Sequence, residues 1–273
     1  MNSRNVAVAA RPTSYSQSLE RGLAILSAFQ PTRPLIGISD LARGLDLHRS
    51  TAHRYVGTLT ALGYLEQDRA TRKYRLGPRV LDLGFSAINS MELPELARPH
   101  LQQLSDESGL TVNMAILDGT EIVYVVRVRS SRRGQEEIDL NLHVGSRLPA
   151  YCTSMGKVLL AFLPDDARAA ALDATDLVGR GPNTVTQRRR LEAELQRVRE
   201  SGIAVNNEEL AYGLRSIAAP VHGRSGDVEA AINIAVHRTM VSLDDLIRRL
   251  GPALEHTAAA ISTRAGHREE PHA

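Results

Sequence analysis

The chain has 273 residues, which is enough for two domains with substantial cores, and its formal net charge is only +2. A single cysteine, Cys152, excludes an internal disulfide and a zinc site built from thiolates. No apolar run approaches the roughly 20 residues of a membrane-spanning helix, and the N-terminus lacks the apolar core of a secretory signal. We therefore expect a soluble, cytoplasmic protein with no membrane partner.

The charge is unevenly distributed along the chain. Residues 1–90 hold 12 Lys and Arg against 6 Asp and Glu, a net charge of +6, whereas residues 91–273 hold 21 against 25, a net charge of −4. A basic first third attached to a mildly acidic remainder is typical of a nucleic-acid-binding module joined to a second domain. Basic charge also suits a membrane surface, but the sequence shows no amphipathic or lipidation segment.

Residues 1–14 are small and polar and predict a disordered tail. Residues 18–29 then predict a helix whose apolar residues recur at helical spacing. These residues are Leu19, Leu23 and Leu26. We expect them to cover the helical motif that follows, and Pro31 and Pro34 to end this helix.

Residues 37–62 predict two short helices joined by a tight turn. On the second helix, one face is apolar and consists of Ala52, Val56, Leu59 and Leu62, with Tyr55 beside them. The opposite face is polar and cationic and consists of Ser50, His53, Arg54, Gly57 and Thr58, flanked by Arg49. A helix of this kind suits the DNA major groove, although an ordinary amphipathic helix with a solvated face has the same pattern.

The segment after this helix decides between these interpretations. Residues 64–67 and 72–76 flank a polar turn, and Lys73 and Arg75 alternate with Tyr74 and Leu76, as in a half-buried hairpin strand. A basic hairpin beside a helix-turn-helix predicts a winged helix-turn-helix whose wing contacts the DNA backbone. The expected DNA contacts are Ser18, Arg21, His48, Arg49, Ser50, Thr51, His53, Arg54, Thr58, Arg72, Lys73 and Arg75.

The remainder of the chain alternates between helical and strand patterns and predicts an α+β domain with one mainly antiparallel sheet. The expected strands are 111–117, 121–129, 137–144, 203–207, 215–222 and 228–237. The expected helices are 94–107, 154–162, 165–172, 187–201 capped by Thr186, and 243–264 capped by Ser242. The expected organisation is a tail (1–14), a winged helix-turn-helix domain (15–76), a linker helix (77–92), a second domain (93–265) and a C-terminal tail (266–273).

The loop 145–153 leads into a helix start, where free backbone N–H groups near Ser154 could bind a carboxylate. Leu148, Tyr151 and Met155 could form walls for an apolar ligand. An ordinary helix start with Ser154 as its own cap fits the same residues. Asn206 and Asn233 interrupt apolar elements, and each needs hydrogen-bond partners from the backbone or from a ligand.

The sequence gives little support for catalysis. It contains no nucleophile elbow, phosphate loop or dinucleotide fingerprint, and its histidines show no metal-type spacing. Cys152 with His143 could act as a nucleophile and a base, but no residue is identified as the third, orienting group. We expect no catalytic residues, no metal site and no cofactor.

The whole arrangement resembles the IclR family of bacterial transcriptional regulators, from Ser18 to about Arg264. The resemblance is carried by SLERGLAIL (18–26), ISDLARGLDLHRSTAHRYVGTLTALGYLE (38–66), LPAYCTSMGKVLLAFLP (148–164), NNEELAYGLRSIAAPV (206–221) and AAINIA (230–235). The YCTSMGK version of the central loop is similar to the branch that regulates protocatechuate and 4-hydroxybenzoate catabolism.

The resemblance implies a homodimer assembling to a homotetramer, whose paired winged helices read palindromic operator DNA. It also implies a GAF-like domain that binds a small organic acid, here an aromatic one. The implied effector contacts, with Tyr151 and Thr153 added, are Leu140, Leu148, Tyr151, Thr153, Ser154, Met155, Asn206, Ser216, Asn233 and Ala235. Some members carry acidic, cysteine or serine side chains at the last four family positions.

Three other functions fit parts of the sequence. The first is a regulator that senses a non-aromatic acid. The second is an enzyme acting on a small organic acid, with a DNA-binding appendage. The third is a structural nucleoid protein that needs no effector, which does not explain the large second domain.

Overall fold

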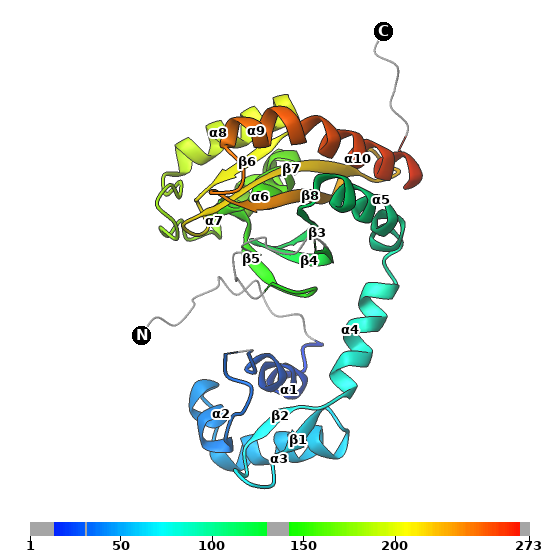
Figure 1. Ribbon diagram of the computed structural model, residues 1–273. Coiled ribbons are helices and arrows are strands. Elements are labelled where there is room, and N and C mark those ends of the chain that lie inside the picture. The colour runs from blue at the N-terminus through cyan, green and yellow to red at the C-terminus, as the bar shows by residue number, and fades with distance from the viewer. Residues whose placement is uncertain (1–13, 31, 130–141, 268–273) are drawn as a thin grey trace. The chain divides into compact units, whose positions relative to one another are not determined.

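The computed structural model describes residues 14–30, 32–129 and 142–267 (Figure 1). The chain divides into two compact units, residues 1–90 and residues 91–273. We call them the N-terminal unit and the C-terminal unit and describe each by itself. Within the described ranges, no helix is long and apolar enough to cross a membrane.

The N-terminal unit contains the expected winged helix-turn-helix. Its elements are α1 (Gln17–Ser27), α2 (Ile38–Gly44), α3 (Arg49–Ala61), β1 (Leu65–Gln67), β2 (Tyr74–Leu76) and α4 (Arg79–Asn89). The two strands pair antiparallel, which confirms the predicted hairpin, and α4 confirms the helix expected after it.

A small core connects these elements. It contains Ile25 of α1, Leu41 of α2, Val56 of α3, Leu65 of β1 and Tyr74 of β2. The turn between α2 and α3 places Asp46 at a φ of 50°, in the left-handed region that Asp tolerates better than most residues. The turn and the core together fix the orientation of α3 relative to α2.

Four apolar side chains do not lie where the sequence pattern placed them. Leu19 and Leu23 are 63% and 54% exposed, Leu62, the residue after α3, is 48% exposed, and Leu76, the last residue of β2, is 39% exposed. Ile25, which is fully buried, lies about 200° from Leu23 around α1 and defines the face that covers the motif. The prediction that Leu19 and Leu23 cover the helix-turn-helix is therefore wrong.

The C-terminal unit contains one six-stranded sheet in the order β5-β4-β3-β8-β7-β6, with every pairing antiparallel. The strands are β3 (Thr111–Asp118), β4 (Glu121–Val128), β5 (Arg147–Pro149), β6 (Ala204–Asn207), β7 (Leu214–His222) and β8 (Val228–His237). The helices are α5 (Glu92–Ser108), α6 (Ser154–Phe162), α7 (Asp165–Asp173), α8 (Arg188–Ser201), α9 (Leu243–Asp245) and α10 (Gly251–Arg264).

The sheet separates two apolar cores, because successive side chains of a strand point to opposite faces. On one face, Val112, Met114, Ile217 and Ile232 pack against α5 and α10. On the other face, α6 lies against small residues, which are Ala115, Ala204, Ala218 and Ala231. Figure 1 shows α5 and α10 on one side of the sheet and α6 on the other.

One expected strand is wrong in its described part. The strand predicted at 137–144 lies mostly outside the described residues, and residues 142–144 form a loop and a turn. The strand that pairs with β4 is β5, inside the segment predicted to be a loop, with Leu148 opposite Ile122. Gly145, at a φ of 89°, makes the turn that directs the chain into β5.

Two helix ends also differ from the sequence prediction. Helix α8 begins after Gln187, which makes no side-chain cap, so Thr186 is not the capping residue. Ser242 does cap the last helical segment, by accepting from the N–H of Asp245 at 3.0 Å. That segment is not one α-helix: residues Leu246–Leu250 form a π-helical turn before Pro252, which has no N–H to continue the regular ladder.

Helix α6 requires a glycine at its third residue. A Cβ on Gly156 would overlap the backbone of Ala150, in the short 3-10 helix that precedes α6. We predict that Gly156→Ala lowers the free energy of unfolding of the C-terminal unit by about 1–3 kcal/mol, because backbone atoms must move apart.

The matched control is Gly251→Ala in α10, where an added Cβ meets nothing within 4 Å. Removing a helical glycine there should raise stability by about 0.5–1 kcal/mol. Chemical denaturation of the full chain, followed by circular dichroism, measures both changes. Equal effects of the two substitutions would contradict the packing argument.

Candidate functional site

Helix α3 presents a polar outer face. Arg49, Ser50, His53, Arg54 and Thr58 are all exposed, as the sequence predicts. Thr51 is half-buried. The outer face therefore carries hydroxyl, imidazole and guanidinium donors on one side of a helix whose other side is packed into a core.

The start of α3 is fixed by His48. Its Nδ1 lies 2.7 Å from the Ser50 hydroxyl and accepts from the backbone N–H of Ser50 at 3.4 Å. His48 is thus the N-cap of α3, in addition to being an expected DNA contact.

Ser18 and Arg21 of α1 lie against Tyr55 of α3. A side-chain hydrogen bond with Ser18, and a second with Arg21, lower the pKa of Tyr55 below its ordinary value. The Arg54 guanidinium lies 5.8 Å from the Tyr55 ring centre. Ser18 and Arg21 therefore connect α1 to α3 and also place polar groups beside α3.

The wing is closed by a polar turn. Asp68 accepts from the backbone N–H of Thr71 at 2.7 Å and from its hydroxyl at 2.6 Å, and these bonds hold the pKa of Asp68 below its ordinary value. Lys73 and Arg72 are exposed, whereas Arg75 pairs with Glu66 across the hairpin at 3.0 Å. The Arg75 guanidinium therefore forms an ion pair with the Glu66 carboxylate inside the wing.

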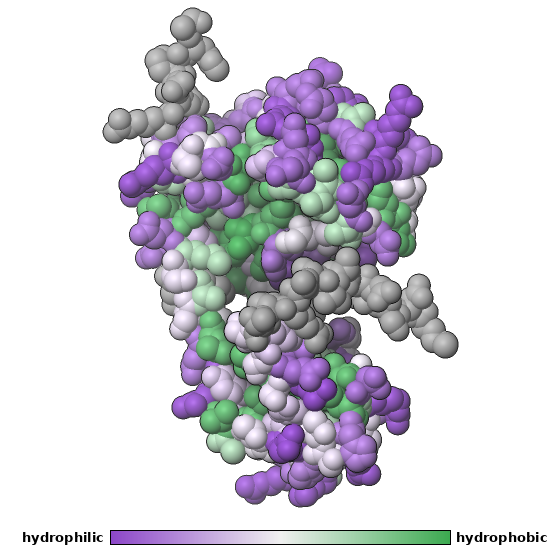
Figure 2. Space-filling view, turned by 180° about the vertical axis from the view of Figure 1, so that it is seen from behind, coloured by the Kyte–Doolittle hydropathy of each residue, from purple (hydrophilic) through white to green (hydrophobic). Residues whose placement is uncertain are grey.

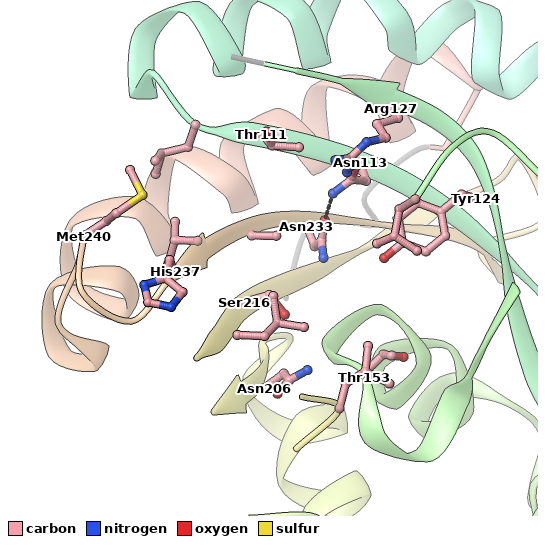
Figure 3. Close-up of a pocket in the computed structure, with 16 residues that line it drawn as sticks. Thr111, Asn113, Tyr124, Arg127, Thr153, Asn206, Ser216, Asn233, His237 and Met240 are labelled. Atoms are coloured by element: carbon pink, nitrogen blue, oxygen red, sulfur yellow. Dashed lines mark hydrogen bonds between the residues drawn. The ribbon is translucent and has the colours of Figure 1, made fainter. Parts of the chain in front are cut away.

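A cavity lies on the α6 face of the sheet in the C-terminal unit, beyond the N-terminus of α6 (Figure 3). It contains about 680 Å³ of empty space, part of it open to solvent. Its apolar walls include Leu110, Leu142, Leu210, Leu214 and Met240. Its polar groups come from the strands and from Thr153.

The strand register places the polar residues in two adjacent rows across the sheet. In the first row, Asn113 of β3 lies opposite Arg127 of β4 on one side and Asn233 of β8 on the other. The second row, two residues along each strand, consists of Thr111, Ala235, Ser216 and Asn206. All seven residues line the cavity.

An irregularity in β4 brings Tyr124 to the same face. The register shifts between Met114 and Ala115, so that Val125 has no partner and Tyr124 and Arg127 both point toward the cavity. In a regular strand, residues three apart would point to opposite faces. Burial raises the pKa of Tyr124 to about 12, and the nearby Arg127 charge opposes the rise.

The second row is hydrogen-bonded to the start of α6. The Ser154 and Ser216 hydroxyls lie 2.7 Å apart. Asn206 donates to the backbone oxygen of Cys152 at 3.2 Å and accepts from the N–H of Glu209 at 3.0 Å. Asn206 thus has the backbone partners that were the alternative to a ligand.

The start of α6 is capped by Thr153 and not by Ser154. The Thr153 hydroxyl accepts from the N–H of Gly156 at 3.2 Å, so this N–H is already bonded. One of the backbone N–H groups that were expected to bind a carboxylate at this helix start is therefore not free to do so. Thr153 itself lines the cavity.

The remaining expected effector contacts lie elsewhere. Tyr151 is buried, and its hydroxyl donates to the backbone oxygen of Val178 at 2.6 Å. Met155 is fully buried in the core beneath α6, with Leu148 packed at its edge. None of the three lines this cavity, so the expected stacking of Tyr151 on a ligand is not supported here. Leu140 lies outside the described residues.

A buried ion cluster holds the loop beside the cavity. The fully buried Lys157 of α6 donates to Glu194 of α8 and to Glu209 of the β6–β7 loop, at 2.6 Å each, and also to the backbone oxygen of Val205. Burial raises the pKa of Glu209, and the Lys157 ammonium opposes the rise. Leu210, which follows Glu209, forms part of the cavity wall.

Cys152 lacks the environment of a nucleophile. Burial raises the pKa of its thiol to about 11, so the thiol is protonated at neutral pH. His143, its proposed base, lies 3.2 Å from the Ser146 hydroxyl. Among the described residues, no group of three or more His, Cys, Asp and Glu side chains is arranged to hold a metal ion.

Two family models match the chain. The IclR helix-turn-helix domain matches residues 18–69, and the bacterial transcriptional regulator IclR C-terminal domain matches residues 85–263. The chain belongs to the IclR family of bacterial transcriptional regulators. This confirms the resemblance inferred from the sequence, and the fold agrees with the expected α+β class.

Relatives of this IclR protein include a regulator of the Pca regulon and a homolog whose structure contains 4-hydroxybenzoate. The Pca regulon regulatory protein of Pseudomonas putida is 39% identical over 240 residues, which are 88% of this chain and 81% of the relative. A candidate transcriptional regulator from Rhodococcus sp. RHA1 has a solved structure with a TM-score of 0.77, 44% identity, and coverage of 91% of this chain and 98% of that one. An IclR homolog from Microbacterium hydrocarbonoxydans, complexed with 4-hydroxybenzoate, has a TM-score of 0.76, 26% identity, and coverage of 91% and 98%.

Sequence reasoning missed several residues of this IclR cavity. Asn113, Tyr124, Arg127 and His237 line it but were not expected. Asn113 could have been found by the same signal as Asn233, an amide in an otherwise apolar strand. Arg127 and Tyr124 could not, because their common direction depends on the irregularity in β4.

Proposed function

We propose that this IclR-type regulator binds operator DNA through α3 and the wing, and that a small aromatic carboxylic acid in the cavity controls this binding. The observation that carries the effector part is the combination of apolar walls with two rows of amide, hydroxyl and guanidinium groups. The relatives support the aromatic class, because one regulates the Pca regulon and another is complexed with 4-hydroxybenzoate.

An aromatic acid has the two kinds of surface that this cavity offers. Its ring can pack between leucines such as Leu110 and Leu214, and its oxygens can accept from Asn233 and Ser216. Arg127 adds a positive charge at the end of the first row. A non-aromatic acid such as pyruvate is the alternative effector, since it could use the same polar groups.

The DNA-binding part rests on the exposed outer face of α3. Its Arg54 and His53 side chains can reach base edges in the major groove, while exposed Lys73 and Arg72 on the wing can reach phosphates. We propose that this binding takes place in the cytoplasm.

We also propose that two copies pair through the N-terminal units. Leu19 and Leu23 form an exposed apolar stripe on α1, and Leu81 and Phe85 form a second on α4, at 54–63% exposure. Figure 2 shows hydrophobic residues on the exposed surface of α4. A second copy is the partner that fits a palindromic operator, and pairs of dimers would form the tetramer.

The proposed mechanism is a shift between two arrangements of such a dimer. A ligand that binds one arrangement more tightly would move the two linker helices (α4 of each copy). The distance between the two winged helix-turn-helix domains, the reading heads of the dimer, would then change. Heads about 34 Å apart dock on successive major grooves of one DNA face.

The effector proposal predicts a ligand-dependent increase in stability. An acid at 100 times its dissociation constant should add about 2.7 kcal/mol to the free energy of unfolding. We expect 4-hydroxybenzoate or protocatechuate to raise the midpoint of thermal unfolding of the wild type. Neither acid should raise the midpoint of the Asn233→Leu variant. A shift with pyruvate or glyoxylate alone would replace the aromatic effector by a non-aromatic one.

The DNA-binding proposal predicts different losses for two cations. Arg54→Ala should weaken operator binding by about 1–3 kcal/mol and relax sequence preference, because Arg54 faces the bases. Lys73→Ala should weaken operator and unrelated DNA alike and lower the salt slope by about one unit. Fluorescence anisotropy at several salt concentrations measures both, and unchanged affinity in both variants would place the DNA face elsewhere.

The dimer proposal predicts that charge on the α1 stripe separates the reading heads. The double variant Leu19→Glu, Leu23→Glu should bind a palindrome no more tightly than a single half-site, whereas the wild type gains affinity from the second half. Val178→Glu, at a similarly exposed position in the C-terminal unit, is the control. Wild-type preference for the palindrome in the double variant would contradict this interface.

A further inference from the structure

The first polar row contains two residues that are not among the proposed hydrogen-bond donors to the ligand, Asn113 and Arg127. We propose that they are positioning residues that fix the amide of Asn233 with its N–H group toward the cavity, so that the site selects a ligand carrying an anionic acceptor, a carboxylate, over the matching neutral amide. This inference rests on the proposed function of the cavity as the effector site.

The three side chains form a continuous hydrogen-bonded chain across three neighbouring strands. Arg127 Nη1 donates to Asn113 Oδ1 at 3.0 Å, and Asn113 Nδ2 donates to Asn233 Oδ1 at 2.8 Å. Asn113 is 1% exposed and Asn233 is 4% exposed. The two amides are therefore largely shielded from water, which would otherwise offer alternative partners, and Arg127 at the end of the chain is half-buried.

The direction of this chain follows from the chemistry of arginine. A guanidinium group has only N–H donors and no acceptor, so the atom of Asn113 that faces Arg127 must be its oxygen. The nitrogen of Asn113 then faces Asn233, which must accept with its own oxygen. The charged residue at one end thus determines the orientation of both amides.

The last group in the chain is the Asn233 nitrogen. Figure 3 shows it directed away from Asn113 and toward the side of the cavity where Ser216 lies. The bond from Asn113 uses the Asn233 oxygen, and among the described residues the Asn233 nitrogen has no hydrogen-bond acceptor. A nearly buried N–H donor aimed into a cavity is unfavourable unless something accepts from it, and a ligand oxygen at this place would do so.

The charge of Arg127 also strengthens this donor. Hydrogen bonds in a chain polarise one another, most strongly when one end is ionised and the surroundings are apolar. A carboxylate oxygen gains more from such a donor than a neutral carbonyl oxygen does. An Asn pair that only satisfied itself inside the sheet would need neither the guanidinium nor an open end.

The test reverses the orientation of Asn233 without changing the shape of the row. In Asn113→Asp, the new carboxylate accepts from Arg127 but cannot donate to the Asn233 oxygen. The Asn233 amide then turns over, donates to that carboxylate and presents its oxygen to the cavity. The full-length protein is titrated calorimetrically with 4-hydroxybenzoate and with 4-hydroxybenzamide, which differ only in the group that meets Asn233.

The matched control is Asn206→Asp, which adds the same charge to the same cavity but touches no member of the first row. We expect Asn113→Asp to lower the preference for acid over amide by about tenfold more than the control does, the size of one charge-assisted hydrogen bond. Arg127→Met, which adds no negative charge, should also lower the preference.

Each outcome decides the proposal. An equal fall in both Asp variants, or an unchanged preference in Asn113→Asp, would show that the row does not select the ligand, while the effector site would stand. Pyruvate and pyruvamide serve as a second pair: if the wild type binds only this pair, the aromatic effector is wrong and the same comparison is made with it. Binding of no acid, or of amides only, would overturn both proposals.

Discussion

The alternation of side chains between the two faces of the sheet is the constraint on which the C-terminal unit depends. Both faces are covered, so every second residue of each strand belongs to a different environment. One face carries a large apolar core that packs against α5 and α10. The other changes from alanines under α6 to amides and hydroxyls beyond the N-terminus of that helix, where the cavity lies.

The position of α6 determines where this change occurs. Its first eight residues are all buried, and its Gly156 lies directly against the backbone of Ala150 in the preceding 3-10 helix. The Ser154 hydroxyl then reaches Ser216 in the second row. The family motif around Tyr151 and Cys152 thus contributes to the cavity by placing α6, and Thr153 is the residue of that motif that lines the cavity.

The sequence allowed most elements of the fold to be predicted, because periodicity, prolines and glycines act locally. The winged helix-turn-helix, the order of helices and strands and the antiparallel pairing all followed from such signals. Other features depend on contacts distant in sequence. The burial of Ile25 in place of Leu19 and Leu23, the pairing of β5 with β4, and the common direction of Tyr124 and Arg127 are of this second kind. Asn206 and Asn233 were noticed as polar exceptions, but only the strand register shows that Asn113 completes the first row.

The buried cluster of Lys157, Glu194 and Glu209 restricts which substitutions could alter the ligand specificity of this regulator. Leu210, in the cavity wall, follows directly after a carboxylate that is nearly buried against an ammonium group. Removing one member of such a pair leaves an uncompensated buried charge, which typically destabilises a protein by about 3–5 kcal/mol. Position 210 is therefore open to variation in size and shape, whereas position 209 can change only together with Lys157. A library that diversifies the whole β6–β7 loop would yield mostly unfolded proteins, and one that keeps Glu209 fixed would sample new ligand specificities on an intact scaffold.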